Sequence, residues 1–316
     1  MKTLVTGCCG FVGRHAMAAL RHAMAALRQA GHDVVGTDIG SLSGSGTSHL
    51  PLDVRDPDSI AHVLAQVRPD AILHLGGLAF VPLGWTQPQR VFHVNTIGTL
   101  NLLDAVRQHL PAARVLVVTS AEVYGSHPAP SPLTEDAPYR PDNIYGVAKA
   151  AADQSALLYA AHHQLDVMVA RPSNHIGPGQ SRDFVSSAFA SQLAAIARGA
   201  DPVMRVGNLD QRRDFTDVRD VARAYALLLD NGKTGAAYNI ASGTMTPVRD
   251  ILDTLCDIAG VRPRIDVDPA LFRPTDERPA YDASRIRRDA AWQPEIPLSQ
   301  TLRDIYADFL HAPAGE

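Results

Sequence analysis

Short apolar runs rich in β-branched residues alternate with longer amphipathic segments over the first 170 residues of the chain. Strand-like runs lie at residues 4–5, 33–37, 71–73, 114–118 and 166–169. Consecutive apolar positions are typical of strands that are buried on both faces of a sheet. Because strands that alternate with helices form parallel sheets with helices on both sides, we expect an α/β fold, a Rossmann-like doubly wound parallel sheet.

The pattern changes after residue 172, where Gly, Pro and polar residues become denser and short strands are expected near 202–206 and 238–240. The 316 residues also exceed the roughly 250–300 at which a single core stops growing. We expect a main domain, to which a later segment returns, and a smaller C-terminal α/β substrate-binding part. The ranges are 1–172 for the main domain, roughly 217–241 for the returning segment, and 173–216 and 242–316 for the smaller part.

Composition and charge narrow the class of protein. Hydrophobic residues make up 46% and charged residues 20%, the net charge is -4, and no Lys/Arg run exceeds two residues. These values favour a globular protein without a nucleic-acid or membrane surface. A strand expected at Lys2–Thr6 leaves no room for a signal peptide, and the three Cys residues show neither disulfide nor metal-ligand spacing. We therefore expect a cytoplasmic protein that binds no metal.

The segment Arg14–Leu20 is repeated letter for letter as Arg21–Leu27. Seven residues drift only about 20° around a helix, so the same apolar face continues through the insertion. A direct duplication predicts a first helix about two turns, or roughly 10 Å, longer than a dinucleotide-binding helix needs.

Three glycines lie in the loop Thr6–Gly13, between the first strand and the first helix. Gly7 permits a tight turn, Gly10 lets the backbone approach a pyrophosphate, and Gly13 lets helix and strand pack closely. The helix N-terminus then faces the anion with its N–H groups. Glycines in this setting predict a dinucleotide site.

Asp38 follows the second strand, 25 positions after Gly13. An acidic residue about 20 positions on holds the adenosine ribose, and subtracting the seven duplicated residues restores that distance. Its carboxylate would repel a 2′-phosphate, so we favour NAD(H) and keep NADP(H) as possible. The alternative is an Asp that merely starts a turn. Asp53 and Val54 lie where such folds contact adenine.

Tyr145 and Lys149 lie four residues apart in a helix expected over 143–163. Side chains at i and i+4 share one helix face, and a neighbouring ammonium favours the phenolate. We therefore expect Lys149 to lower the pKa of Tyr145 and make it an acid or base near neutral pH. The spacing alone also occurs by chance in many helices.

Six segments together resemble the extended short-chain dehydrogenase/reductase family: 6–13, 74–77, 95–99, 120–125, 145–149 and 171–172. The resemblance implies that Ser120 and Tyr145 bind the reacting sugar oxygen, that Lys149 holds the nicotinamide ribose, and that Asn95 lies behind Lys149. Further cofactor contacts are implied for Phe11, Val12, Leu75, Gly76 and His175. His175 also follows Asn174 in the expected sugar loop, where it could contact ligand or cofactor or neither.

The second half resembles GDP-6-deoxy-4-keto-D-mannose reductases, in segments 173–180, 206–218 and 268–274. The resemblance implies that Arg213 and Arg273 bind the diphosphate and that Asn174 binds substrate. Without it, each Arg would be read as a surface ion-pair residue. Two positions depart from the pattern of these reductases and bear on the identity of the sugar. Ser173 stands in place of Phe, and Gly76-Gly77 stands in place of a more common Ala-Ala or Ala-Gly.

The expected reaction is NAD(P)H-dependent reduction of the C4 ketone of a nucleotide-linked 4-keto-6-deoxyhexose, giving GDP-D-rhamnose. Glu122 leaves two alternatives open. One is a 4,6-dehydratase, because a Glu at this place removes the C5 proton in related 4,6-dehydratases. The other is a 4-epimerase. A non-catalytic NAD-binding sensor is a remote alternative. The resemblance also implies a homodimer through a four-helix bundle of 89–108 and 143–163.

Overall fold

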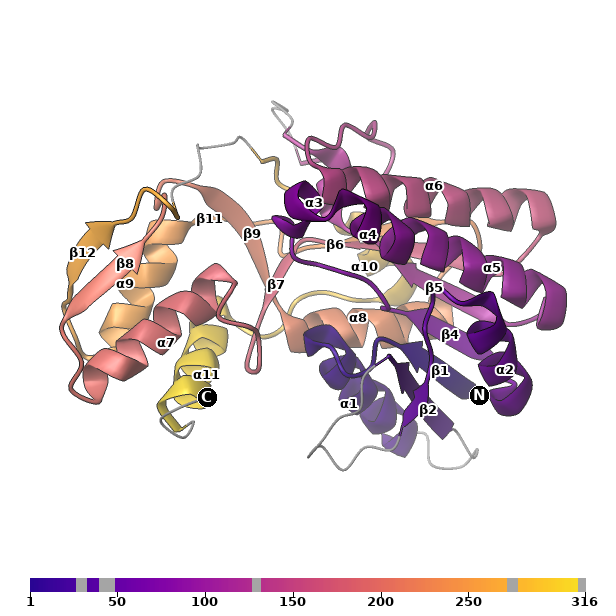
Figure 1. Ribbon diagram of the computed structural model, residues 1–316, viewed down its shortest axis with the longest axis horizontal. Helices are drawn as coiled ribbons and strands as arrows, with labels where there is room; N and C mark the ends of the chain where they lie inside the picture. Colours follow the sequence, from indigo (N-terminus) through magenta and orange to yellow (C-terminus); the bar gives the residue numbers. More distant parts are fainter. Residues whose placement is uncertain (27–32, 40–48, 127–131, 272–277, 312–316) are drawn as a thin grey trace.

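The apolar runs of the N-terminal half form adjacent strands of one parallel sheet (Figure 1). The computed structural model describes residues 1–26, 33–39, 49–126, 132–271 and 278–311. Seven strands lie in the order β10-β6-β5-β4-β1-β2-β3, and every neighbouring pair is parallel. Their bounds are β1 (Lys2–Thr6), β2 (Asp33–Asp38), β3 (His49–Pro51), β4 (Ala71–His74), β5 (Arg114–Val118), β6 (Val167–Pro172) and β10 (Ala237–Ile240). The predicted doubly wound sheet is confirmed.

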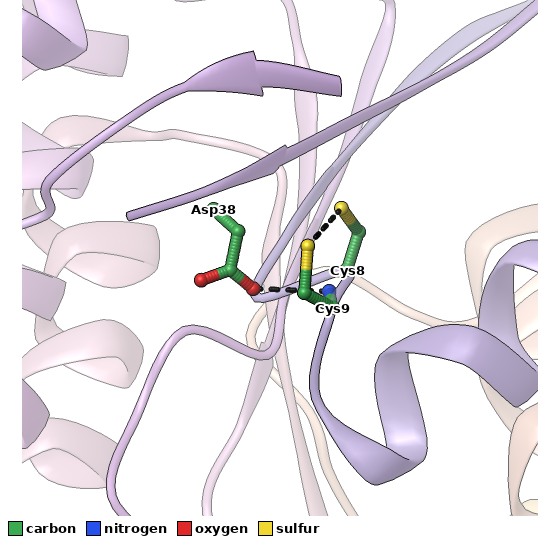
Figure 2. A group of neighbouring side chains, drawn as sticks. All are labelled: Cys8, Cys9 and Asp38. Atoms are coloured by element: carbon green, nitrogen blue, oxygen red, sulfur yellow. Dashed lines mark hydrogen bonds between the residues drawn. The ribbon is translucent and has the colours of Figure 1, made fainter. Parts of the chain in front are cut away.

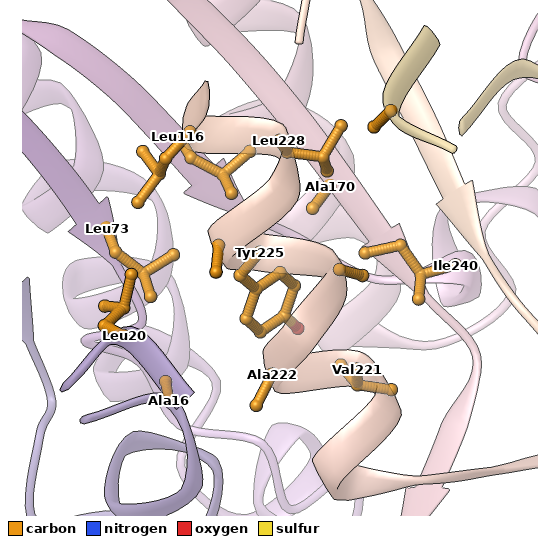
Figure 3. Packing of buried hydrophobic residues seen from close by; sticks show 14 of the residues in the cluster. Ala16, Leu20, Leu73, Leu116, Ala170, Val221, Ala222, Tyr225, Leu228 and Ile240 are labelled. Carbon is orange, nitrogen blue, oxygen red and sulfur yellow. The ribbon is translucent and has the colours of Figure 1, made fainter. Parts of the chain in front are cut away.

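Helices cover both faces of this sheet, as the apolar character of its strands requires. One face carries α1 (Phe11–Ala26), α8 (Val218–Asn231) and α10 (Ser284–Ala290); the other carries α2 (Pro57–Val67), α5 (Gly98–His109) and α6 (Ile144–His163). In Figure 3, Tyr225 and Leu228 of α8 pack on Leu73, Leu116 and Ala170 of the sheet.

Local signals set where the helices begin. The Asp56 carboxylate accepts a hydrogen bond from the Asp58 N–H, and Pro57 takes the first helical position of α2. The Asn143 side chain accepts from the Gly146 N–H at the start of α6. These caps fix the first turn of each helix, and in α6 that turn carries Tyr145.

The duplicated segment continues α1. Ala16, Met17 and Leu20 of the first copy are buried against the sheet. Residues 21–26 of the second copy remain helical, with Arg21 and His22 exposed, and Leu27 lies outside the described residues.

A helical run over residues 88–109 consists of α4 (Pro88–Phe92), the π-helical turn η1 (His93–Ile97) and α5. The short α3 (Leu83–Thr86) precedes it, and η2 (Ala121–Tyr124) follows β5. A π turn inserts an extra residue into a helix and is often found at functional sites. None of the described helices is both long and apolar enough to cross a membrane.

The smaller part lies beside the carboxyl ends of the strands (Figure 1). Its strands are β7 (Asn174–Ile176), β9 (Arg212–Asp217) and β11 (Met245–Pro247) in one sheet, and β8 (Val203–Val206) and β12 (Arg264–Val267) in another. The helices α7 (Val185–Ala197), α9 (Val248–Ala259) and α11 (Leu298–His311) pack on them around a separate apolar core. Between β9 and β11 the chain forms α8 and β10, and β10 pairs with β6 of the large sheet.

Candidate active site

A cavity of about 660 Å³ lies between the large sheet and the smaller part. Ligands of open parallel sheets bind outside the carboxyl ends of the strands, which is where this cavity lies. Sixteen of the predicted site residues line it: Gly7, Gly10, Phe11, Val12, Gly13, Asp38, Asp53, Val54, Leu75, Gly76, Ser120, Glu122, Tyr145, Lys149, Asn174 and His175. Asn95 and Arg213 are described but are not part of this wall, and Arg273 lies outside the described residues.

The glycine loop can be built only with glycine at two positions. Gly7 has φ +71°, and a Cβ there would lie 2.9 Å from the Gly76 nitrogen. A Cβ on Gly13 would lie 2.1 Å from the Gly7 carbonyl oxygen. The loop therefore packs tightly between β1 and β4 and presents backbone and the start of α1 to the cavity. These features fit a dinucleotide pyrophosphate.

The Asp38 carboxylate is fixed on this loop. Its Oδ2 accepts from the Cys9 N–H at 3.0 Å (Figure 2). Its Oδ1 accepts from the Ile39 N–H at 2.8 Å. A carboxylate at the end of β2 is placed to accept bonds from ribose hydroxyls.

Cys8, Cys9 and Asp38 also form a compact group of possible metal ligands, with the two Sγ atoms 3.7 Å apart. Burial raises the pKa of Cys8 to about 12 and also raises that of Cys9. Cys8 fills the space beside Gly36, where a Cβ would lie 2.7 Å from its Sγ.

Asp53 and Val54 form the wall beyond β3. The Arg55 side chain contacts the Asp53 carboxylate at 2.6 Å, and this hydrogen bonding lowers the pKa of Asp53. Asn101 donates to the Val54 carbonyl at 3.1 Å, which fixes the backbone here. The carboxylate of Asp53 is engaged by Arg55, so the segment offers an apolar and backbone surface for a flat ring.

Ser120 and Tyr145 come together at the carboxyl end of β5. Ser120 caps η2, where its Oγ accepts from the Glu122 N–H at 3.1 Å. Burial raises the pKa of Tyr145, while a hydrogen bond with Ser120 lowers it and the charge of Glu122 raises it. The net effect keeps Tyr145 a neutral phenol, which can donate a proton.

The expectation that Lys149 lowers the pKa of Tyr145 was wrong for this geometry. Lys149 donates to the Val118 carbonyl at 2.9 Å, and burial of Tyr145 dominates its own pKa. Burial also lowers the pKa of Lys149 to about 8, against the opposing charge of Asp153. Sequence spacing placed the two side chains on one face but carried no information on their burial.

Asp153 belongs to a buried network that sequence reasoning missed. Arg171 contacts both of its carboxylate oxygens at 2.9 Å, and Thr119 and Tyr139 donate to it at 2.8 and 2.7 Å. The Arg171 guanidinium also lies over the rings of Tyr124 and Tyr139. Arg171 belongs to the motif at residues 171–172, but nothing along the chain points to its partner. The network fixes α6 against β6, next to Lys149.

Asn95 acts on the backbone near Lys149. It lies in the π turn, where its Oδ1 accepts from the Leu78 N–H at 2.8 Å and its Nδ2 donates to the Leu78 carbonyl at 3.0 Å. A Cβ on Gly77 would lie 2.9 Å from Asn95 Oδ1 and 3.4 Å from Lys149 Nζ. The glycine at position 77 therefore makes room for these two polar side chains.

The ring of His175 lies parallel to that of Phe11, with ring centroids 6.3 Å apart and an interplanar angle of 8°, and both residues line the cavity. Its Nδ1 donates to the Ser173 carbonyl at 3.0 Å, and burial lowers its pKa. A neutral imidazole with Nδ1 engaged is a packing surface for a ligand. The neighbouring Asn174 is exposed within the cavity.

Ser173 and Arg213 belong to the smaller part of the chain. The Ser173 hydroxyl donates at 3.1 Å to Asp214, a buried carboxylate that also accepts from the Ser242 and Gly243 N–H groups. Arg213 donates to the Arg212 carbonyl at 2.8 Å. Burial raises the pKa of Tyr281, which lines the cavity, and the charge of Arg213 opposes this shift. Arg213 is thus near the cavity without forming its wall.

Comparison with known proteins places this geometry in a family. A family model described as GDP-mannose 4,6 dehydratase matches residues 4–305 of the chain. GDP-6-deoxy-D-mannose reductase of Pseudomonas aeruginosa is 36% identical over 98% of this chain and 97% of its own length. The chain belongs to the extended short-chain dehydrogenase/reductase family. The resemblance drawn from its motifs is confirmed.

Solved members of the family have the same fold. The structure of RMD from Pseudomonas aeruginosa complexed with NADPH aligns with a TM-score of 0.84 at 35% identity, covering 98% of both chains. UDP-glucose 4-epimerase of Thermus thermophilus in complex with NAD aligns with a TM-score of 0.85 at 26% identity, covering 99% of this chain and 100% of that one. The chain is therefore an enzyme of an NAD(P)-dependent oxidoreductase family whose members bind either dinucleotide.

Proposed function

We propose that the protein reduces the C4 ketone of a nucleotide-linked 4-keto-6-deoxyhexose, converting GDP-4-keto-6-deoxy-D-mannose to GDP-D-rhamnose. The observation that carries this proposal is that the buried side chains of Ser120 and Tyr145 line the same cavity. Reduction of a ketone requires a proton donor at the carbonyl oxygen. The 36% identity to a GDP-6-deoxy-D-mannose reductase supports the same substrate class.

The chain's own residues serve the carbonyl oxygen. A reduced nicotinamide dinucleotide, when bound, supplies the hydride that adds to C4. Ser120 donates a hydrogen bond to the oxygen as negative charge develops there, and Tyr145 delivers the proton. Lys149 would hold the nicotinamide ribose, and its ammonium would supply the proton that restores Tyr145.

For the dinucleotide, the glycine loop would hold the pyrophosphate and Asp38 the adenosine ribose, with NAD(H) favoured and NADP(H) possible. Adenine would lie against Asp53 and Val54, and the nicotinamide side near Leu75, Gly76 and His175. Asn95 would act by fixing the backbone behind Lys149. Asn174, Arg213 and Arg273 would bind the nucleotide sugar, where a guanidinium suits diphosphate oxygens.

The second candidate is a nucleotide-sugar 4,6-dehydratase or 4-epimerase. Glu122 favours the dehydratase, because its carboxylate lines the same cavity two residues after Ser120. A non-catalytic NAD-binding sensor has less support, because Ser120, Tyr145 and Lys149 all lie on one cavity wall.

The domain division is part of the proposal. Residues 1–172 together with about 217–241 would form the dinucleotide-binding domain, supported by the pairing of β10 with β6. Residues 173–216 and 242–316 would form the nucleotide-sugar part, supported by their separate apolar core.

A homodimer through a four-helix bundle is the proposed assembly. The helices 89–108 and 143–163 expose large apolar side chains, with Ile97, Val147 and Leu158 at 42%, 38% and 64% exposure. Val147 and Leu158 are about three turns apart and so share a face of α6. Apolar side chains gathered on one face mark interaction sites.

We place the enzyme in the cytoplasm. All three cysteines are free, which suits a reducing compartment. The substrates proposed here, a nucleotide sugar and a nicotinamide dinucleotide, are also metabolites of that compartment.

The test offers GDP-4-keto-6-deoxy-mannose with NADH or NADPH and follows nicotinamide absorbance, with the product sugar identified by NMR. We expect cofactor oxidation, and a loss of at least about 100-fold in kcat for Tyr145→Phe, the contribution typical of a general acid. Dinucleotide binding should persist in this variant. Water loss from GDP-mannose without cofactor consumption would assign the dehydratase, and unchanged turnover in Tyr145→Phe would overturn the proposed role of Tyr145.

A further inference from the structure

In a reductase, a carboxylate at position 122 can catalyse an unwanted side reaction at C5 of the sugar. The hydrogen on C5 is adjacent to the C4 ketone and is therefore acidic. Ser120 and Glu122 line the same cavity, and the charge of Glu122 raises the pKa of Tyr145. A carboxylate free to reach C5 would remove this hydrogen while Ser120 and Tyr145 stabilise the enolate oxygen.

The Glu122 carboxylate is, however, held by two other side chains. Its Oε2 accepts from Asn143 Nδ2 at 2.8 Å and lies 3.4 Å from Nη2 of Arg278. The same Nη2 lies 3.2 Å from Asp142. The Arg278 side chain is only 9% exposed, so this ion pair is screened far less than one on the surface.

These contacts join three segments of the chain. Glu122 lies in η2 after β5, and Asn143 is the cap of α6, the helix that carries Tyr145 and Lys149. Arg278 comes from the C-terminal part of the chain, beyond β12. The C-terminal part thus places a positive charge on a carboxylate of the reaction cavity.

We propose that Arg278, together with Asn143, restrains the Glu122 carboxylate from acting as a base at C5 and thereby limits the site to reduction. Arg278 is a positioning residue, because its guanidinium acts on Glu122 and not on the sugar. The inference rests on the proposed function, since it concerns the same keto sugar in the same cavity.

The reaction that Arg278 suppresses is hydrogen exchange without net chemistry. A free Glu122 takes the C5 proton, and the electron pair of the C–H bond moves to give the C4–C5 enolate. In D2O the carboxylic acid exchanges its proton, returns a deuteron to C5, and restores the ketone. No oxidant or reductant is consumed, so exchange can be measured with the oxidised dinucleotide present.

The experiment incubates GDP-4-keto-6-deoxy-mannose in D2O with the enzyme and the oxidised dinucleotide and measures C5 deuterium by NMR and mass spectrometry. We compare the wild type with Arg278→Met, which keeps the apolar stem and removes the guanidinium. We expect exchange at least tenfold faster in Arg278→Met. The double variant Arg278→Met/Glu122→Gln should return to the wild-type rate.

Two further variants separate this role from a structural one. Asn143→Ser keeps an oxygen that can cap α6 but removes the amide donor to Glu122, so exchange should also rise. Arg285→Met is the matched control. Arg285 is a partly buried Arg from the same C-terminal part and pairs with Glu135 and Asp136. Neither of these two carboxylates lines the cavity. Its exchange rate should equal that of the wild type.

Exchange at the wild-type rate in folded, dinucleotide-binding Arg278→Met and Asn143→Ser would overturn the inference, as would faster exchange that persists without Glu122. Failure of the proposed function is a separate outcome, because the wild type would then not oxidise NADH or NADPH with the keto sugar. A wild type that reduces the sugar while its Arg278 variant shows no added exchange would refute only the role of Arg278.

Discussion

Replacement of Arg171 by Met isolates the energetic role of the buried pair that supports α6. Arg171 and Asp153 are 2% and 0% exposed and share two contacts of 2.9 Å. Met fills part of the space of the Arg stem and removes the guanidinium. The Asp153 carboxylate would keep only the hydroxyls of Thr119 and Tyr139 as partners in the network.

The expected cost follows from what is left unpaired. Removing one partner of a buried ion pair costs about 3–5 kcal/mol, because the remaining charge stays buried without compensation. The two lost charge-assisted hydrogen bonds, at about 1.5–3 kcal/mol each, give a sum of the same size. We therefore expect Arg171→Met to lower the free energy of unfolding by about 4 kcal/mol, a large fraction of the ~5–15 kcal/mol typical of a folded protein.

Urea unfolding, followed by circular dichroism, measures this loss as a lower midpoint at unchanged slope. Arg264→Met is the matched control, because Arg264 and Asp266 form a 3.0 Å pair with side chains 69% and 44% exposed. An exposed pair contributes about 0–1 kcal/mol, so this variant should unfold near the wild-type midpoint. If Arg171→Met cost no more than Arg264→Met, the argument from burial would be wrong.

Three further predictions concern the site. Burial lowers the pKa of Lys149 to about 8, and the charge of Asp153 opposes this shift. Activity that needs the Lys149 ammonium should therefore fall as pH rises through about 8. Asp153→Asn should move this fall to lower pH. Gly13→Ala should weaken dinucleotide binding at least about tenfold, or ~1.4 kcal/mol, because its Cβ would lie 2.1 Å from the Gly7 oxygen. Asp38→Asn should raise the ratio of kcat/KM for NADPH to that for NADH about tenfold, because the repulsion of a 2′-phosphate is removed.

Each of these has its own check. A pH profile of kcat/KM that is identical in Asp153→Asn would contradict the coupling to Lys149. Gly235→Ala serves as the control for Gly13→Ala, since a Cβ on Gly235 has nothing within 4 Å, although its φ of +74° strains an Ala there. It should lose stability and keep dinucleotide affinity. An unchanged NADPH-to-NADH ratio would show that Asp38 does not select the dinucleotide.

The sheet and the glycine loop could be predicted because their signals are local. Each run of β-branched residues specifies a buried strand by itself, and the spacing of Gly7, Gly10 and Gly13 indicates a loop in which Gly7 and Gly13 leave no room for a Cβ. Asp38 required one more step, the subtraction of the duplicated segment. These parts depend on neighbouring residues, and the structure places them as expected.

The remaining parts depend on burial and on contacts between distant segments. The pKa of Tyr145 is raised because the side chain is buried, which its spacing from Lys149 does not reveal. Asp153 and Arg171, and likewise Glu122 and Arg278, meet only after the strands and the smaller part are assembled. A charged residue read along the chain has many possible partners, and only the folded chain selects one.

The late return of the chain to its first sheet bears on how the protein is made. During synthesis on the ribosome, β6 remains an open sheet edge until β10 has emerged, some 65 residues later. The indole of Trp292 emerges later still, and it is buried against α8 with its Nε1 donating to the Asp220 carbonyl at 2.8 Å. The nascent chain therefore cannot complete its N-terminal layers in the order in which its residues are synthesised. It must hold an unpaired strand edge exposed while those residues are synthesised, a stage at which such edges are prone to aggregation.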